Sequence, residues 1–176
     1  MRTLDIGDII IAKKEPIDVW AVLGSCIAVI FYAKDKVAML CHSQLSSQED
    51  TGYTCHEKCP NPCFNDLENS NKSKFVKCTL EYMIDYLRNM DIDLSKLNTT
   101  LLGGASLIGK IEGKETVGEK NVRIAKEILK KEGIPINREM VGGDTGYVLW
   151  YNTRTDKLFI KLQKDKGERS ELLNNR

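Results

Sequence analysis

Short apolar runs bounded by turn-forming residues recur along the chain, and this pattern is typical of β-strands. The runs cover residues 8–12, 19–23, 27–33, 37–42, 99–102, 147–151 and 157–162. Only the polar turn Lys34-Asp35-Lys36 separates 27–33 from 37–42. These two runs therefore predict a β-hairpin.

Two further segments carry apolar residues at every third or fourth position, the spacing of one buried helical face. The first predicted helix covers about 76–90, with Ser73 as its N-cap. The second covers about 118–132 and ends at Gly133. Strands in hairpins combined with two main amphipathic helices predict an α+β domain with a mixed sheet, layered as an α/β/α sandwich.

The chain has 176 residues, a length that favours one domain over 1–176. Between about 43 and 74 the apolar periodicity disappears, and Ser, Asn, Asp, Gly and Pro dominate. A loop of this length is functional, organised by a metal, or mobile. Residues 163–176 are polar and charged, and they predict a frayed tail or a terminal helix.

Composition narrows the class of partner. Lys and Arg number 26 and Asp and Glu 25, so the net charge of +1 provides no field that would hold nucleic acid or an anionic membrane. No apolar stretch approaches the roughly 20 residues that a bilayer requires, and the N-terminus lacks the apolar region of a signal peptide. We expect a cytoplasmic protein without membrane insertion, whose six cysteines are free thiols.

One thiol and one imidazole stand out. Cys26 follows a glycine-containing turn at the start of an apolar strand, and His42 ends the partner strand. If the turn centres on Asp35, Ala28 pairs with His42, and Cys26 lies on the same face two residues along. Such a pair suits nucleophilic acyl transfer, in which the imidazole takes the thiol proton. The alternative is a small buried cysteine beside a structural histidine.

Several motifs resemble, in order, those of the CheD family, the chemoreceptor glutamine deamidases of bacterial chemotaxis. Leu23-Gly-Ser-Cys-Ile-Ala-Val-Ile30 is similar to the family's nucleophile segment, and Ala38-Met-Leu-Cys-His42 to its strand ending in the catalytic histidine. The resemblance covers most of residues 5–162. The remaining motifs are Gly103-Gly-Ala-Ser106, Val117-Gly-Glu-Lys-Asn-Val122, Gly133-Ile-Pro-Ile136, Val141-Gly-Gly-Asp-Thr-Gly146 and Tyr151-Asn-Thr-Arg-Thr-Asp-Lys157.

The resemblance implies an α/β/α layered fold and a protein-glutamine amidohydrolase, with Cys26 as nucleophile and His42 as base. Backbone N–H groups near Ser25 and Cys26 would hold the oxyanion. The implied substrates are glutamine side chains of methyl-accepting chemotaxis receptors, hydrolysed through a cysteine thioester, and glutamyl methyl esters could share this intermediate. A CheC-like phosphatase is the implied partner. No nucleotide fingerprint occurs, so no cofactor is expected.

The family's third site residue is a threonine six positions before the cysteine, where this chain has Trp20. Indole is only a hydrogen-bond donor, so it cannot accept a hydrogen bond from imidazole. Another group must therefore orient His42, and a backbone carbonyl and Asp18 are the candidates. The alternative function is an adaptor that binds CheC or receptors and whose catalysis is weak or lost.

A second cysteine cluster lies in the long loop. Cys55, Cys59 and Cys63, with His56 beside them and Cys78 or Cys41 as a fourth ligand, have a spacing that zinc or an iron–sulfur cluster permits. A metal- or redox-sensing variant is therefore a third possibility. The alternative is a mobile loop with incidental thiols. The glycine pairs at 103–104 and 142–143 either line a substrate groove or form tight turns.

Overall fold

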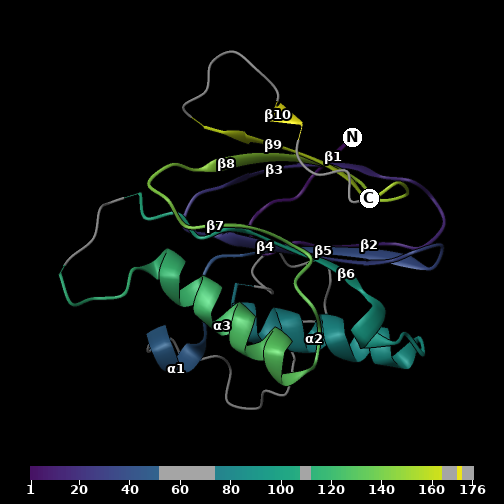
Figure 1. The fold of residues 1–176 in the computed structure, drawn as a ribbon, viewed down its shortest axis with the longest axis horizontal. Coiled ribbons are helices and arrows are strands. Elements are labelled where there is room, and N and C mark those ends of the chain that lie inside the picture. The colour runs from purple at the N-terminus through teal and green to yellow at the C-terminus, as the bar shows by residue number, and fades with distance from the viewer. Residues whose placement is uncertain (52–73, 108–111, 164–169, 172–176) are drawn as a thin grey trace.

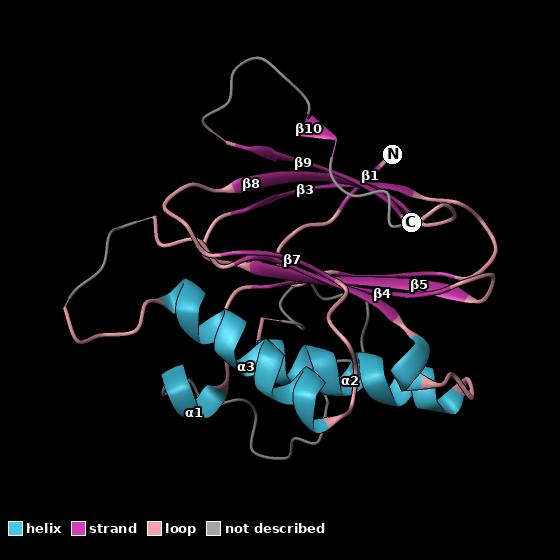
Figure 2. Ribbon diagram, viewed as in Figure 1, coloured by secondary structure: helices cyan, strands magenta, loops and turns pink. Residues whose placement is uncertain are grey.

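Two stacked β-sheets and one layer of helices make up the protein (Figures 1 and 2). The structure is a computed structural model that describes residues 1–51, 74–107, 112–163 and 170–171. The helices cover one face of the central sheet, and the outer sheet covers the other face.

The central sheet has the strand order β2-β5-β4-β6-β7. All its neighbours are antiparallel except β6 and β7, which are parallel, so the sheet is mixed. The strands are β2 (Ile9–Ala12), β5 (Val37–Ser43), β4 (Ile27–Ala33), β6 (Asn98–Gly103) and β7 (Arg138–Val141).

The outer sheet has the order β1-β3-β8-β9-β10, with β1 parallel to β3 and the other neighbours antiparallel. Its strands are β1 (Arg2–Thr3), β3 (Asp18–Leu23), β8 (Tyr147–Asn152), β9 (Lys157–Leu162) and β10 (Ser170–Glu171). The helical layer contains α1 (Gln48–Thr51), α2 (Val76–Asn89), the 3₁₀ turn Leu94–Lys96 and α3 (Val117–Lys131).

Burial on both faces of the central sheet explains why β4 and β5 are almost continuously apolar. Alternate residues of β4 point to opposite sides. Val29 and Phe31 pack in the core beneath the helices, whereas Ala28 and Ile30 pack in the core against the outer sheet. The two cores therefore share one hairpin.

The predicted mixed strand pairing, the hairpin, the two amphipathic helices and the layered α+β class are confirmed. The layers follow the order sheet, sheet, helices, so the outer sheet takes the place that a second helical layer has in an α/β/α sandwich. The reason is that α2 and α3 both pack on one face of the central sheet. The other face is covered by the outer sheet, in which β3 directs Val19, Ala21 and Leu23 toward the core between the two sheets.

The helix ends differ in how they are capped. Thr116 and Glu119 form a capping box at the start of α3, in which the side chain of each binds the backbone of the other. At the start of α2 the N-cap residue is Phe75, which makes no side-chain capping bond. The predicted cap Ser73 lies outside the described residues.

Parts of the predicted long loop and tail are described. Leu45 forms a bridge with Phe75, and α1 follows shortly after, so the beginning and the end of the loop lie side by side. The cysteines at 55, 59 and 63 and His56 lie outside the described residues. In the tail, Ser170–Glu171 pair with β9 as a strand, so these two residues do not form the terminal helix that was one expectation.

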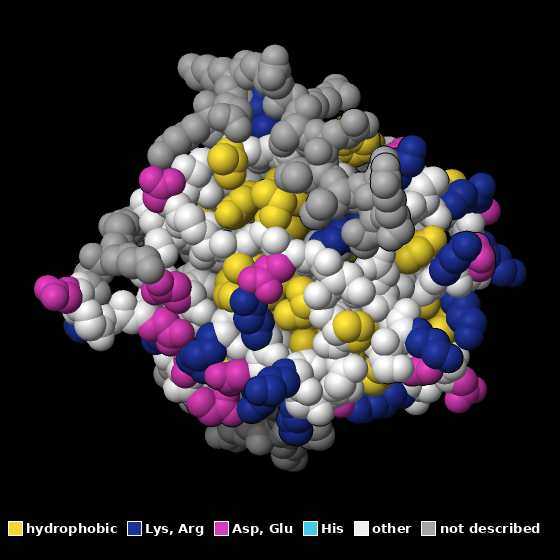
Figure 3. Space-filling view, in the orientation of Figure 1, with side chains coloured by type: hydrophobic (Ala, Val, Ile, Leu, Met, Phe, Trp, Pro, Cys, Tyr) yellow, Lys and Arg dark blue, Asp and Glu magenta, His cyan; other side chains and the backbone are white. Residues whose placement is uncertain are grey.

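Charge is mixed over the face of the molecule that Figure 3 shows. In Figure 3, basic and acidic side chains are interspersed over the visible face, as the balanced composition leads one to expect. Within the described ranges, we find no helix with the length and apolar character needed to cross a membrane.

One buried ion pair joins the two sheets at the end where the β4–β5 turn lies. Arg138 of β7, whose side chain is 4% exposed, binds Asp156 in the β8–β9 turn at 2.5 Å. Tyr151 also donates to Asp156, at 2.8 Å, and Arg138 donates to Thr100 at 2.7 Å. These bonds satisfy both charges within the interior, as a buried pair requires.

We expect Asp156→Asn to lower the free energy of unfolding by about 3–5 kcal/mol, because it leaves the Arg138 charge buried without a counter-charge. Asparagine suits the test because it tolerates the positive φ of 55° at this position. Urea titration of both proteins measures the difference. Lys126→Ala is the control: it breaks the exposed Lys126–Glu139 pair and should change the free energy by less than about 1 kcal/mol. Equal effects of the two substitutions would contradict the role of the buried pair.

Candidate active site

Cys26 and His42 lie on adjacent strands of the central sheet. The β4–β5 register pairs Ala28 with His42, as predicted from the turn at Asp35. Cys26 immediately precedes β4, and by strand alternation its side chain shares the Ala28 face, toward the outer sheet. Both residues are buried, with 8% of Cys26 and 3% of His42 exposed. The hairpin therefore brings the thiol and the imidazole to one face at one end of the molecule.

The His42 ring is oriented by a backbone carbonyl. Its Nδ1 lies 2.9 Å from the carbonyl oxygen of Leu4. A carbonyl only accepts hydrogen bonds, so the neutral ring carries its proton on Nδ1, and Nε2 keeps a lone pair. Nε2 is buried, and it has no hydrogen-bond partner in the described part of the chain. This is the tautomer that a general base requires.

The segment that links β1 to β2 also holds the His42 backbone. Gly7 N–H donates to the His42 carbonyl at 2.8 Å, and His42 N–H donates to the Asp8 carbonyl at 3.2 Å. Leu4 itself is held by its N–H, which donates to the Trp20 carbonyl at 2.8 Å. The imidazole is therefore fixed by a crossover between the two sheets.

Two residues that the sequence brought into consideration do not orient the ring. Trp20 follows Val19 and precedes Ala21, which both face the core, so its side chain lies on the opposite face of the outer sheet. Asp18 is exposed and accepts a hydrogen bond from Asn152 at 2.7 Å. Of the two candidates considered, the backbone carbonyl is the one that the structure provides.

Burial sets the protonation of both groups. It raises the pKa of the Cys26 thiol above its ordinary value of 9.0, and the Cys26 N–H partly opposes this shift. Burial lowers the pKa of His42 below 6.5, and the Leu4 carbonyl and the nearby carboxylates Asp5 and Asp8 partly oppose it. At neutral pH the pair is therefore a thiol and a neutral imidazole. No hydrogen bond joins them, so their side chains must approach for a proton to move.

Glycines on two neighbouring strand ends make close backbone contacts next to Cys26. Gly104 N–H donates to the Cys26 carbonyl at 2.8 Å, and Gly142 N–H donates to the Gly103 carbonyl at 2.9 Å. Gly103 has a φ of 98°, and a Cβ there would overlap the Cys26 carbonyl. Gly103, Gly104, Gly142 and Gly143 all have positive φ angles, a backbone conformation that favours glycine and accounts for this residue type at the four positions.

Sequence reasoning did not single out Asn121 of α3, which is fully buried behind the site. Its Nδ2 donates to the carbonyls of Ser25, at 2.9 Å, and Gln44, at 2.8 Å. The motif 117–122 contains Asn121, and the three-residue spacing from Gly118 places both residues on one helical face. This spacing is the feature of the sequence that could have indicated a buried role for Asn121.

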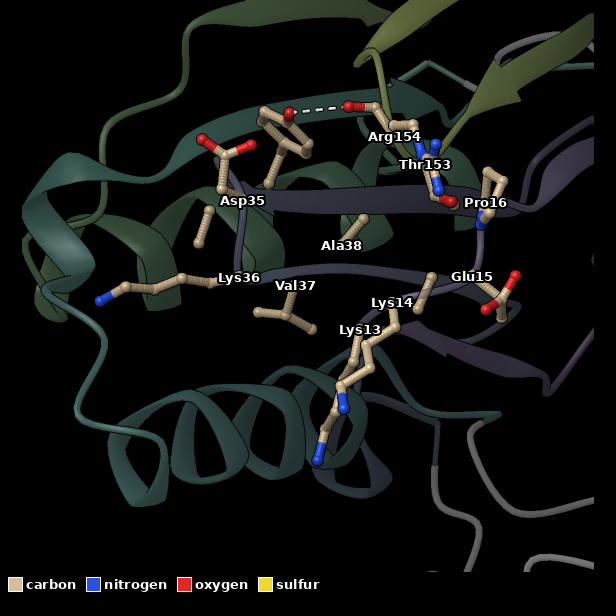
Figure 4. Close-up of a pocket in the computed structure, with 13 residues that line it drawn as sticks. Lys13, Lys14, Glu15, Pro16, Asp35, Lys36, Val37, Ala38, Thr153 and Arg154 are labelled. Carbon is tan, nitrogen blue, oxygen red and sulfur yellow. Dashed lines mark hydrogen bonds between the residues drawn. The ribbon is translucent and has the colours of Figure 1, made fainter.

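A pocket of about 340 Å³ lies at the other end of the hairpin, away from Cys26 (Figure 4). It is lined by residues around the β4–β5 turn together with Lys13, Lys14 and Arg154. In Figure 4 the side chains of Lys13 and Lys14 point down toward the helix and that of Lys36 points sideways. The Lys36 ammonium group therefore points away from those of Lys13 and Lys14.

The described residues contain no group of three or more side chains suited to hold a metal ion. Cys41 and Cys78, considered above as fourth ligands, form no disulfide within the described residues. The cysteine cluster of the long loop lies outside the described residues, so the metal hypothesis stays a prediction.

Fold and site together define a layered α+β protein that carries a buried thiol and an oriented imidazole at one end of its two sheets. The model of the CheD family, described as CheD chemotactic sensory transduction, matches residues 60–162. The chain belongs to this family.

Relatives extend the similarity over most of the chain. A protein of Thermococcus kodakarensis is 30% identical over 158 residues, which are 89% of this chain and 89% of that protein. One of Caldanaerobacter subterraneus subsp. tengcongensis is 32% identical over 143 residues, 79% and 78% of the two chains. One of Methanococcus maripaludis is 27% identical over 157 residues, 89% and 91%. All three are named "Probable chemoreceptor glutamine deamidase CheD".

We expect His42 to titrate below pH 6.5 and to carry its neutral proton on Nδ1, because burial disfavours the charged ring and the Leu4 carbonyl holds that proton. Nitrogen chemical shifts of the ring, recorded by NMR during a pH titration, measure both properties. His42→Gln assigns the signals, since His56 is the other histidine. A proton on Nε2, or a pKa above 6.5, would contradict the described orientation.

Proposed function

We propose that this protein is a cytoplasmic chemoreceptor glutamine deamidase in which Cys26 is the nucleophile and His42 the general base. The observation that carries the proposal concerns the unprotonated Nε2 of His42. It has no hydrogen-bond partner among the described residues, and it lies on the same face as the Cys26 thiol. The deamidase names of the family relatives support the choice of substrate.

Acylation begins with proton transfer, because both groups are neutral at rest. His42 Nε2 takes the thiol proton while the Cys26 sulfur attacks the carbon of the glutamine side-chain amide. The tetrahedral intermediate collapses as His42 returns the proton to the leaving nitrogen. Ammonia departs, and a Cys26 thioester remains.

Deacylation reverses these roles with water as the nucleophile. His42 Nε2 takes a proton from water, whose oxygen attacks the thioester carbon. The carbon–sulfur bond breaks, the Cys26 sulfur regains the proton, and the product is a glutamate side chain. A glutamyl methyl ester would give the same thioester with methanol as leaving group, so the site is suited to both reactions.

The oxyanion of each tetrahedral intermediate needs hydrogen-bond donors. We assign this role to the backbone N–H groups of Ser25 and Cys26. The Cys26 N–H already lies close enough to its own sulfur to oppose the rise in the thiol pKa. The receptor supplies the glutamine, and a CheC-like phosphatase is the proposed binding partner.

Cys26→Ala should reduce deamidation by about 10⁴-fold or more, because the acyl-enzyme cannot form. The assay incubates cytoplasmic fragments of chemoreceptors with the protein and detects the conversion of glutamine to glutamate by peptide mass spectrometry. Cys78→Ala is the matched control, since Cys78 lies on α2 and should leave the rate unchanged. Full activity of Cys26→Ala would refute the assignment, and an inactive wild type on several receptors would favour an adaptor.

The acid limb of the pH profile of kcat/KM should have its midpoint below pH 6.5. The pKa of His42 is lowered, so its neutral, basic form persists as the pH falls through 6.5 and is lost only at lower pH. Initial rates between about pH 4.5 and 8 measure this midpoint. A midpoint above 6.5 would exclude His42 as the base that limits the rate.

A further inference from the structure

Asn121 is tied to both strands of the candidate site from the opposite side of the central sheet. In the β4–β5 register the pairs are Ala28 with His42 and Ile27 with Ser43, so Cys26 and Gln44 would come next. The ladder stops before that pair. Instead, Asn121 Nδ2 donates to the carbonyls of Ser25 and Gln44, at 2.9 and 2.8 Å. One side-chain amide replaces strand pairing where the two strands separate.

The bond to Ser25 determines where the Cys26 N–H points. The Ser25 carbonyl and the Cys26 N–H belong to one peptide unit, and no cis peptide occurs in the described chain. In a planar trans peptide the C=O and N–H bonds point in opposite directions. α3 packs on the helix-covered face, where Ala125 and Leu129 lie. Holding the carbonyl toward α3 therefore directs the N–H toward the face that carries the Cys26 side chain.

Close approach of α3 makes this reach possible. Gly118 lies against Gly104, where a Cβ would overlap the Gly104 carbonyl oxygen. Gly104 in turn binds the Cys26 carbonyl. Asn121 is one turn further along the same helical face, opposite Ser25. The two helical residues act together: Gly118 lets the helix approach, and Asn121 binds the backbone.

The chemistry of the side chain is specific to an amide. Both acceptors are carbonyl oxygens, so both hydrogens of Nδ2 are used, and this also fixes which end of the amide faces them. Oδ1 is buried and, among the described residues, has no hydrogen-bond partner. A buried polar atom without a partner is unfavourable for stability and calls for an explanation.

We propose that Asn121 is a positioning residue that orients the Ser25–Cys26 peptide so that the Cys26 N–H can stabilise the oxyanion. This inference rests on the proposed deamidase function. Asn121 contacts the backbone behind the thiol and does not touch the substrate. The same N–H stabilises the thiolate, so loss of Asn121 should also make the thiol harder to ionise.

The test is Asn121→Leu, which keeps the volume and removes both donors. We expect kcat for receptor-fragment deamidation to fall about 100-fold with KM changed less than about twofold, the result for an interaction made mainly in the transition state. Iodoacetamide labelling of Cys26, followed across pH by peptide mass spectrometry, should shift its midpoint to higher pH. Asn121→Ser, which keeps one donor, should lie between wild type and Asn121→Leu in both measurements.

Asn137→Leu is the control, because Asn137 accepts a hydrogen bond from Thr99 N–H at the other end of β6. It should leave kcat and the labelling midpoint unchanged, and melting temperatures report any general loss of stability. If Asn121→Leu does not fold, the comparison of Asn121→Ser with wild type tests the proposal.

Wild-type kcat and an unchanged labelling midpoint in the folded variants would overturn the proposal. If wild type itself does not deamidate receptors, the proposed function fails, and the labelling midpoint still decides whether Asn121 orients the Cys26 N–H.

Discussion

The register of β4 against β5 is the constraint on which the site depends. Side chains alternate along a strand, so a slip of one residue would move His42 from the core beside the outer sheet to the core beneath the helices. Both faces of this hairpin are buried, by Val29 and Phe31 on one side and Ala28 and Ile30 on the other. A slip would disturb both cores at once, so the packing of the two cores specifies the pairing that places Cys26 and His42 on one face.

The same burial gives the site its chemical character. A thiol and an imidazole in water would be partly ionised near neutral pH, but here the pKa of each moves toward the neutral form. Such a pair does not rest as thiolate and imidazolium. It is suited to a reaction in which the proton moves as the nucleophile attacks, and it requires a base nitrogen that nothing else occupies. His42 Nε2, for which the described part of the chain offers no hydrogen-bond partner, meets that requirement.

A backbone carbonyl, rather than a third side chain, orients the His42 ring. The Leu4 carbonyl fixes the His42 tautomer, and the Trp20 carbonyl holds Leu4. Residue 20 supports the orientation of His42 through its backbone carbonyl. Its place in β3 is therefore more important for this role than the identity of its side chain. On the other side of the sheet, Asn121 binds the Ser25 carbonyl. The site is therefore supported from the outer sheet through Leu4 and from the helical layer through Asn121.

The sequence by itself determined the strands of the hairpin, the two amphipathic helices and the pairing of Ala28 with His42, because these follow from local periodicity and from a turn at Asp35, which adopts a φ of 61°. It also carried the family motifs that pointed to Cys26 and His42. It did not determine the order of the layers, since alternation shows that a face is buried but not what covers it. Only the tertiary structure decided what orients His42 and the Ser25–Cys26 peptide, because those hydrogen bonds join residues 38 and 96 positions apart, and local pattern carries no information about such contacts.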